Sequence, residues 1–175
     1  MTLKEGIALI KTDKINSFRA ATWADLGCGS GLFTYALAGM LNNKSTIYAI
    51  DKNITSFKKN LTFKSFEIIP VELDFEKQDL PFIKFDGILM ANSLHFIKNK
   101  NDFIKKIKSR LNRGGLFLVV EYDTEAGNHW IPYPITFEGL KELFAATGFP
   151  GASKINERPS AFNSANLYSA IAEHT

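Results

Sequence analysis

Short apolar stretches recur along the first 122 residues, and glycine-rich or polar stretches separate them. They lie at residues 20–24, 46–51, 66–75, 85–96 and 111–121. Runs of this kind between turn residues are typical of strands buried in a parallel sheet. Residues 151–158 and 166–172 have a similar character, and we expect them to form the last two strands. The pattern therefore predicts a sheet of seven strands.

Apolar residues at helical spacing follow several of these stretches. They are Ile54, Phe57 and Leu61; Phe103, Ile104, Ile107 and Leu111, closed by Gly114 and Gly115; and Phe137, Leu140, Leu143 and Phe144, with Gly148 as a C-cap. Alternating strands and helices predict an α/β fold with helices on both faces of the sheet. Residues 76–84 are expected to form a loop or a single turn, and residues 2–12 at most one small helix.

The most informative segment is the turn DLGCGSG at residues 25–31, which lies between an apolar run and the expected helix LFTYALA. Alternating glycines permit positive φ and let main-chain atoms approach a ligand, and a helix start adds free N–H groups. A dinucleotide site uses the spacing G-x-G-x-x-G. Here Leu32 occupies the third glycine position, and Asp25 adds a carboxylate. The turn therefore suits a ligand with a cationic amine better than a pyrophosphate.

Acidic residues also end the next two apolar stretches, Asp51 after TIYAI and Asp74 after PVEL. In nucleotide-binding α/β folds, an acid at the end of the second strand binds the ribose hydroxyls. The sequence therefore predicts a nucleoside-containing ligand at the carboxyl edge of the sheet.

With these motifs the chain resembles the class I S-adenosylmethionine-dependent methyltransferases. The matching segments are DLGCGSG, IYAID, LDFEKQDLPF, FDGILMANSLHF and LNRGGLFLVVE, in the family's order across residues 20–122, and the remainder fits the family's last helix and strand pair. The resemblance implies a Rossmann-like, doubly wound sheet of order 3-2-1-4-5-7-6 with one antiparallel strand, and S-adenosylmethionine as cofactor. It implies these cofactor-binding residues: Asp25, Gly27, Gly29 and Gly31 for the aminoacyl end, Asp51 for the ribose, Asp74 and Phe75 for the adenine, and Asn92 beside the sulfonium.

The acceptor side is expected where the fourth, fifth and sixth strands end. His95 could act as a base or contact the substrate, since imidazole titrates near neutral pH, or it could pack against the cofactor as a lid. The tetrad Asn-Ser-Leu-His at residues 92–95 differs from the Asn/Asp-Pro-Pro-Tyr/Phe of enzymes that methylate exocyclic or amide nitrogens. Further candidates for the acceptor pocket are Glu121, His129, Trp130, Tyr133 and Arg158. The two aromatic residues could instead cover the core, and Arg158 could pair with Glu121 or Asp123.

Composition fits a single domain. The 175 residues are 45% hydrophobic and 22% charged, so residues 1–175 are expected to be one methyltransferase domain with a minimal N-terminal extension. We find no membrane-length apolar run, no signal-peptide pattern and no metal-ligand cluster. Cys28 is the single cysteine, so an internal disulfide is excluded. These features predict a cytoplasmic protein.

A basic segment, residues 97–113, contains seven Lys and Arg residues and one Asp. Such a segment can bind nucleic acid, but its apolar stripe favours a solvated helix face. We therefore expect methyl transfer to a small-molecule acceptor by in-line displacement. The alternatives are an RNA acceptor bound by the basic segment, a non-catalytic cofactor-binding module, and an aminopropyl transferase of the same fold.

Overall fold

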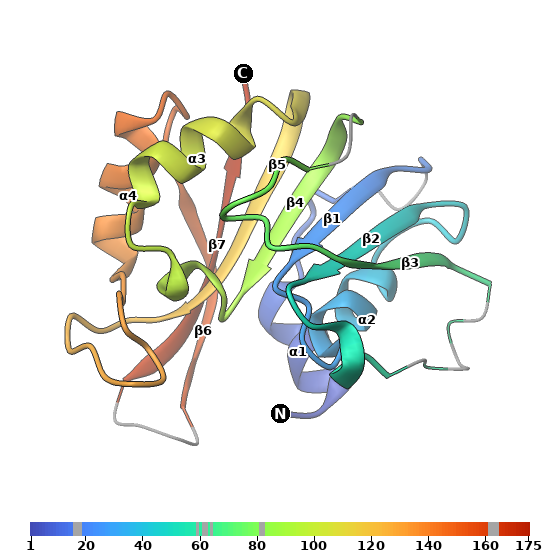
Figure 1. The fold of residues 1–175 in the computed structure, drawn as a ribbon, viewed down its shortest axis with the longest axis horizontal. Helices are drawn as coiled ribbons and strands as arrows, with labels where there is room; N and C mark the ends of the chain where they lie inside the picture. The colour runs from blue at the N-terminus through green and yellow to red at the C-terminus, as the bar shows by residue number, and fades with distance from the viewer. Residues whose placement is uncertain (16–18, 59, 61–62, 64, 81–82, 161–164) are drawn as a thin grey trace.

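The chain forms one mixed sheet of seven strands in the order β3-β2-β1-β4-β5-β7-β6, as predicted (Figure 1). A computed structural model describes residues 1–15, 19–58, 60, 63, 65–80, 83–160 and 165–175. The strands are β1 (Thr22–Leu26), β2 (Thr46–Asp51), β3 (Glu67–Glu72), β4 (Phe85–Ala91), β5 (Leu111–Tyr122), β6 (Ser153–Pro159) and β7 (Asn166–Glu173). Only β7 runs antiparallel to its two neighbours, β5 and β6. The carboxyl ends of the other six strands therefore share one edge.

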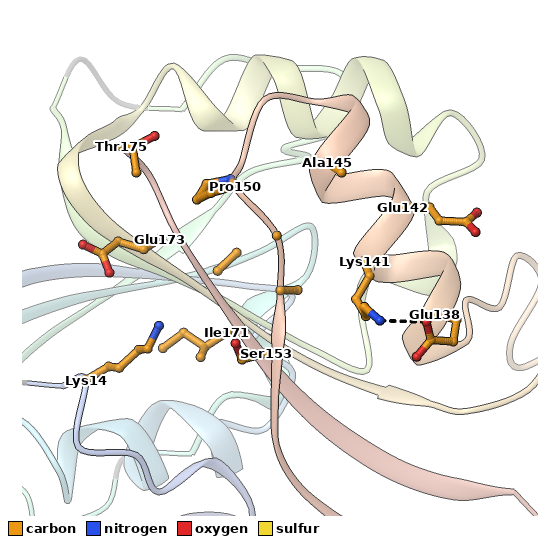
Figure 2. Close-up of a pocket in the computed structure, with 13 residues that line it drawn as sticks. Lys14, Glu138, Lys141, Glu142, Ala145, Pro150, Ser153, Ile171, Glu173 and Thr175 are labelled. Atoms are coloured by element: carbon orange, nitrogen blue, oxygen red, sulfur yellow. Dashed lines mark hydrogen bonds and ion pairs between the residues drawn. The ribbon is translucent and has the colours of Figure 1, made fainter.

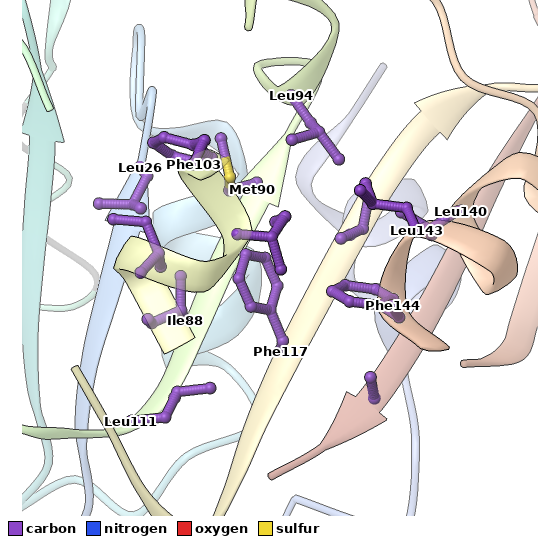
Figure 3. Packing of buried hydrophobic residues seen from close by; sticks show 14 of the residues in the cluster. Leu26, Ile88, Met90, Leu94, Phe103, Leu111, Phe117, Leu140, Leu143 and Phe144 are labelled. Carbon is purple, nitrogen blue, oxygen red and sulfur yellow. The ribbon is translucent and has the colours of Figure 1, made fainter. Parts of the chain in front are cut away.

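Two helices cover each face of the sheet (Figure 1). Helices α1 (Leu3–Ile10) and α2 (Leu32–Ala38) pack on one face, together with Trp23 and Leu118. Helices α3 (Lys100–Lys108) and α4 (Phe137–Ala146) pack on the other face, and Figure 3 shows their apolar residues meeting the side chains of β4 and β5. Burial of these apolar side chains supplies the main force that holds the layers together.

The helix ends follow local capping chemistry. Thr2 and Glu5 form a capping box at the start of α1, the Asn99 side chain accepts from the Asp102 amide at the start of α3, and the Thr136 side chain accepts from the Gly139 amide in α4. Gly148 follows α4 with φ of 83°, as its predicted role requires. The prediction of one small helix within residues 2–12 is confirmed by α1.

Two predicted helical patterns are corrected. After Asp51 the described residues begin with a short 3-10 helix, η1 (Ile54–Ser56), in place of the expected longer helix, and Leu61 lies outside the described residues. Phe57 instead stacks on Tyr35 at 5.9 Å between ring centroids, so its apolar side chain belongs to a loop over α2. Leu111 is not part of α3 either, because it begins β5 and pairs with Phe85.

The described residues of the connection from β3 to β4 contain turns and no helix, as expected for residues 76–84, of which Pro81 and Phe82 lie outside the description. None of the helices described here has the length and apolar character that spanning a membrane requires.

Candidate functional site

The glycine-rich turn joins β1 to α2 at the carboxyl edge of the sheet. Gly27, Gly29 and Gly31 all have positive φ, of 85°, 51° and 92°. The amide of Gly27 donates to the Ile50 carbonyl at 2.7 Å, which fixes the turn against β2. A Cβ atom at Gly27 would collide with the Ser93 side chain, whereas nothing lies within 4 Å of a Cβ built on Gly29. The turn therefore requires glycine for close packing on one side and leaves the Gly29 backbone open on the other.

Asp25 lies at the end of β1 and is only 1% exposed. The Thr34 hydroxyl donates to its Oδ2 at 2.6 Å, while its Oδ1 is buried with no hydrogen-bond partner among the described residues. Burial raises the pKa of the Asp25 carboxyl to about 7; the charge of Asp51 adds to the rise, and the Thr34 hydrogen bond opposes it.

Asn92 follows β4 and carries a second buried oxygen without a partner. Its φ is 52°, its amide donates to the Val120 carbonyl at 2.8 Å, and its Oδ1 is unpaired within the described part of the chain. Ser93, which the sequence analysis did not single out, donates from Oγ to the Leu26 carbonyl at 2.6 Å. This bond ties the end of β4 to the glycine turn, so Asn92 and Asp25 approach the turn from adjacent strands.

Asp51 ends β2 beside the same turn. Its Oδ2 accepts from the Gly29 amide at 3.0 Å, and its Oδ1 accepts from the Asn53 amide at 3.1 Å. A carboxylate oxygen can accept more than one hydrogen bond, so this half-buried group is fixed in place and can still accept from the two hydroxyls of a ribose.

Asp74 and Phe75 lie in the next connection, close to the end of β2, because the Leu73 amide donates to the Asp51 carbonyl at 2.9 Å. Asp74 Oδ1 accepts from the Glu76 amide at 3.2 Å, and its Oδ2 lies 3.2 Å from Lys77 Nζ. The Phe75 ring packs against Phe103 at 5.9 Å between centroids. The Asp74 carboxylate is thus bonded to residues of the turn that contains it, and the contact of this segment with adenine stays a prediction.

These observations fit a ligand that carries an ammonium group and a ribose. Two buried oxygens on adjacent strands lack donors, and an ammonium group supplies three. Gly29 leaves open space, and Asp51 is fixed beside it. Cys28 supplies no nucleophile here, because burial first, and then the charges of Asp25 and Asp51, raise the pKa of its thiol. The described residues contain no group of three or more metal-ligating side chains.

A buried histidine–glutamate pair lies beside Asn92. His95 belongs to the 3-10 helix η3 (Leu94–Phe96) and is 3% exposed, and Glu121 in β5 is 1% exposed. The carboxylate lies 2.7 Å from His95 Nδ1 and accepts from the His95 amide at 3.1 Å. This contact places the proton on Nδ1, so Nε2 is the ring nitrogen left to meet a ligand.

A cavity of about 480 Å³, called here the His95 cavity, opens next to this pair. Its lining residues are Asn92, His95, Phe96, Tyr122, Asn128, Trp130 and Ile131. Its described lining consists of aromatic, amide and aliphatic side chains together with His95, and includes no Lys, Arg, Asp or Glu. This composition suits a planar, uncharged molecule.

The other predicted acceptor residues lie at different distances from this cavity. Tyr133 is close, since its amide donates to the His95 carbonyl at 3.0 Å, while the exposed His129 packs edge to face on Trp130 at 5.5 Å between centroids. Arg158 is not among the lining residues, and its guanidinium pairs with Glu5 of α1 at 2.9 Å rather than with Glu121 or Asp123.

Two further hollows lie away from the glycine turn. One of about 760 Å³ lies between α4 and the strands β6 and β7, and Figure 2 shows the ion pair of Lys141 and Glu138 at its side. Another of about 280 Å³ lies at the amino edge of the sheet, near Asp86 and Arg113. Neither lining contains a residue predicted from the sequence to bind cofactor or acceptor.

The basic segment is partly engaged within the protein. Lys106 Nζ lies 3.2 Å from the Asp79 carboxylate, Lys108 Nζ donates to the Gly148 carbonyl, and Lys100 Nζ donates to the carbonyls of Ile97 and Tyr133 at 2.8 and 2.6 Å. From the sequence, Lys100 is noted only as one of the cations of this segment. Its contact with residues 123–136, the loop between β5 and α4 that is called here the acceptor loop, depends on the fold.

Comparison with known proteins agrees with this geometry. A family model described as a methyltransferase domain matches residues 24–119, more than half of the chain. Fusarielin synthase FSL1 of Gibberella zeae is 23% identical over 163 residues, which cover 77% of this chain but only 6% of the length of that protein.

Two solved structures have a similar fold. The first is 1,6-didemethyltoxoflavin-N1-methyltransferase of Burkholderia thailandensis, with bound 1,6-didemethyltoxoflavin and S-adenosylhomocysteine. It has a TM-score of 0.70 at 18% identity, and the match covers 99% of this chain and 78% of the other. The CurJ carbon methyltransferase has a TM-score of 0.68 at 18% identity, covering 93% and 50% of the two chains.

Proposed function

The chain belongs to the methyltransferase domain family, and we propose that it methylates an uncharged, planar small molecule bound in the His95 cavity. It is an S-adenosylmethionine-dependent methyltransferase. The cofactor, when bound, supplies an electrophilic methyl group on a sulfonium. The observation that carries the choice of acceptor is the cavity of about 480 Å³, which adjoins Asn92 and has an aromatic, uncharged lining.

The residues at the glycine turn would hold the cofactor. Asp25 Oδ1 and Asn92 Oδ1 would accept from its ammonium group, because both oxygens are buried and lack donors in the described chain. Asp51 would accept from the ribose hydroxyls, and Asp74 and Phe75 would lie against the adenine. Holding methyl group and acceptor in line contributes roughly 7–11 kcal/mol of the barrier reduction in well-oriented reactions.

His95 would take the acceptor's proton on Nε2. Its Nδ1–H donates to Glu121, which fixes the ring orientation and stabilises the imidazolium that forms. The bound cofactor would supply the methyl group, and the proton that the acceptor loses would go to His95 Nε2. This role explains a buried carboxylate behind the ring better than packing alone, because packing does not require a charge there.

The small-molecule acceptor is supported over RNA by the described lysine contacts. Lys100, Lys106 and Lys108 bond to carbonyl or carboxylate groups of the protein itself. One structural neighbour is a 1,6-didemethyltoxoflavin-N1-methyltransferase with its acceptor bound, and another is a carbon methyltransferase. The first of these acts on a small molecule, which supports a small-molecule acceptor here.

The test is methyl transfer from S-adenosylmethionine labelled in its methyl group to a panel of phenols and their carboxylate-bearing analogues. We expect labelled product from the uncharged phenols and none from the acids. His95→Gln should lower kcat by roughly 10²- to 10⁴-fold, the usual contribution of a general base, and leave S-adenosylhomocysteine affinity unchanged.

His174→Gln is the matched control, because His174 follows β7 at the opposite edge of the sheet and should leave the rate unchanged. Equal rates for the wild type and His95→Gln would assign His95 to packing. Cofactor binding without label transfer to any acceptor class would contradict the proposed reaction.

A further inference from the structure

Exposed aromatic side chains gather around one opening of the molecule. Among the described residues, the large hydrophobic side chains that are most exposed are Trp130 (79%), Phe96 (51%), Met1 (46%) and Tyr133 (39%). Trp130 and Phe96 line the His95 cavity, and the Tyr133 amide bonds to the His95 carbonyl. Thus two exposed aromatic side chains, Trp130 and Phe96, lie in the lining of a single cavity, and the backbone of Tyr133 is bonded beside it.

Trp130 and Phe96 each line this cavity and are also exposed to solvent. The Phe96 ring packs on the His95 ring at 4.4 Å between centroids, yet half of Phe96 faces solvent. Exposed apolar surface that continues into a cavity marks a ligand-binding groove rather than a random surface position. The apolar surface of the site therefore extends beyond the cavity itself.

The loop that carries Trp130 is held in its present shape. Asn128 Oδ1 accepts from the amides of Trp130 and Ile131 at 2.8 and 3.0 Å, and the Asn128 amide donates to the Ile131 carbonyl at 3.0 Å. Such a side-chain turn fixes the local backbone. Trp130 is 79% exposed, so the described residues leave most of it uncovered.

Methyl transfer benefits from the exclusion of water around the reacting atoms. With the mouth of the cavity rimmed by exposed aromatic side chains, the group that excludes water must come with the acceptor. Among the described residues, the lining has no Lys, Arg, Asp or Glu side chain that would favour an ionic partner. An apolar ring of the acceptor meets these requirements, since aromatic pairs add attraction beyond the area that they bury.

We propose that the acceptor is an extended, uncharged molecule with at least two rings. One ring lies in the cavity at His95, and the second lies outside it across Trp130 and Phe96, where it closes the site. This inference rests on the proposed function and adds the size and shape of the substrate class.

The test compares phenol with 4-phenylphenol, which differ by one ring, in binding to the protein saturated with S-adenosylhomocysteine. Calorimetry should give 4-phenylphenol at least a tenfold tighter dissociation constant, equivalent to about 1.4 kcal/mol. Trp130→Ala and Phe96→Ala should each remove most of that ratio, because each should weaken the binding of 4-phenylphenol more than the binding of phenol. Glu125→Ala, an exposed change in the same loop outside the cavity lining, should preserve the ratio.

Two results would overturn the inference. One is an equal ratio in the wild type and the Trp130→Ala protein, which includes an equal loss of affinity for both ligands. The other is that neither ligand binds to the cofactor-saturated protein. The second result would leave the mouth to a protein partner. Methyl transfer is read separately with labelled cofactor. The binding of 4-phenylphenol could depend on Trp130 and Phe96 while no acceptor receives the label. That result would refute the proposed reaction and support a binding site for two rings at the mouth of the cavity.

Discussion

Asp25 is an acid in a place where its charge is unfavourable for the free protein. It is 1% exposed, and one of its oxygens has no hydrogen-bond donor in the described chain. We propose that a bound ligand accounts for this position, because an ammonium group would supply both a donor and a countercharge. We infer that Asp25 lowers the stability of the free protein and raises its affinity for the cofactor, a common trade-off at binding sites.

The pH dependence of this effect has a definite sign. Burial raises the pKa of Asp25 from 3.8 to about 7, so the folded state binds the proton more tightly than the unfolded state. Below pH 3.8 both states are protonated and the effect is absent. Between these values the unfolded state loses its proton first, and the free energy of unfolding falls as pH rises. Above about pH 7 this decrease in the free energy of unfolding is complete, and it amounts to at most about 4 kcal/mol.

Asp25→Asn should therefore raise the melting temperature of the free protein at pH 8 and change it little at pH 4. The same variant should bind S-adenosylhomocysteine at least about tenfold more weakly, since a charge-assisted hydrogen bond is lost. Thermal unfolding at the two pH values and calorimetry measure the two effects. Asp13→Asn, at an exposed aspartate outside the site, is the control. Unchanged affinity in the folded Asp25→Asn protein would show that Asp25 does not contact the ligand.

Motif spacing located most of the candidate site residues, but it could not predict their hydrogen-bond partners or their burial. Asp25, Asp51 and Asn92 lie around the glycine turn as the sequence predicted. The contacts that orient them come from distant residues, such as Ser93 to Leu26 and Gly29 to Asp51, so they depend on the assembled sheet. The pairing of His95 with Glu121 likewise joins η3 to β5, across 26 positions of the sequence.

At the scale of elements, hydrophobic periodicity predicted the strands and the helix α4. The order of the strands in the sheet came from the family resemblance. The prediction of helices from apolar spacing was wrong where the apolar residue packs from a loop or a strand. Phe57 has helical spacing from Ile54, yet its ring stacks on Tyr35. Leu111 continues the stripe of α3 by count, yet it pairs with Phe85 in the sheet. Spacing alone does not distinguish these cases, because both environments bury the side chain.

Arg158 illustrates the same limit for a strand. It lies near the carboxyl end of β6, as predicted, but its side chain reaches Glu5 of α1. The pairing of β6 with β7 shifts register between Lys154 and Asn156. Such an irregularity changes which face the following residues occupy, and nothing in the local sequence marks it.

Lys100 connects two elements of the acceptor side. Its Nζ bonds to the Ile97 carbonyl at the end of η3 and to the Tyr133 carbonyl in the loop after β5. Burial lowers the pKa of this half-buried amine, while the charge of Glu121 acts in the opposite direction. The lysine therefore holds the acceptor loop against the helix that carries His95.

Lys100→Met should loosen this loop without unfolding the protein. The Tyr133 amide, which donates to the His95 carbonyl, should exchange with deuterium about tenfold faster, equivalent to about 1.4 kcal/mol for the lost charged hydrogen bond. Hydrogen exchange followed by mass spectrometry measures it. Lys98→Met, at an exposed lysine nearby, should leave exchange unchanged. The same rate in Lys100→Met and wild type would mean that the loop is held by other contacts.

At the scale of the whole molecule, the crossover from β4 to β5 carries the last lysines of the basic segment away from the cavity. Helix α3 begins beside η3 at the carboxyl edge, where Lys100 reaches the acceptor loop. It ends at the amino edge, where the Arg110 carbonyl accepts from the amide of Phe85 at the start of β4. The last turn of α3 carries Lys105, Lys106 and Lys108. An RNA strand bound by these lysines would lie at the edge of the sheet opposite the His95 cavity.

We therefore expect that these three lysines do not form an RNA site. The net charge of +3 is small, and Lys106 and Lys108 already bond to Asp79 and Gly148. Binding through three phosphates would weaken steeply with salt, with a log–log slope of about −2 for single strands. Fluorescence anisotropy with a labelled single-stranded RNA at low and physiological salt should show no sub-micromolar binding. It should also show no difference between wild type and the Lys105→Ala, Lys106→Ala, Lys108→Ala variant. Salt-sensitive, sub-micromolar binding that the triple variant loses would reverse this interpretation and make RNA the acceptor to consider first.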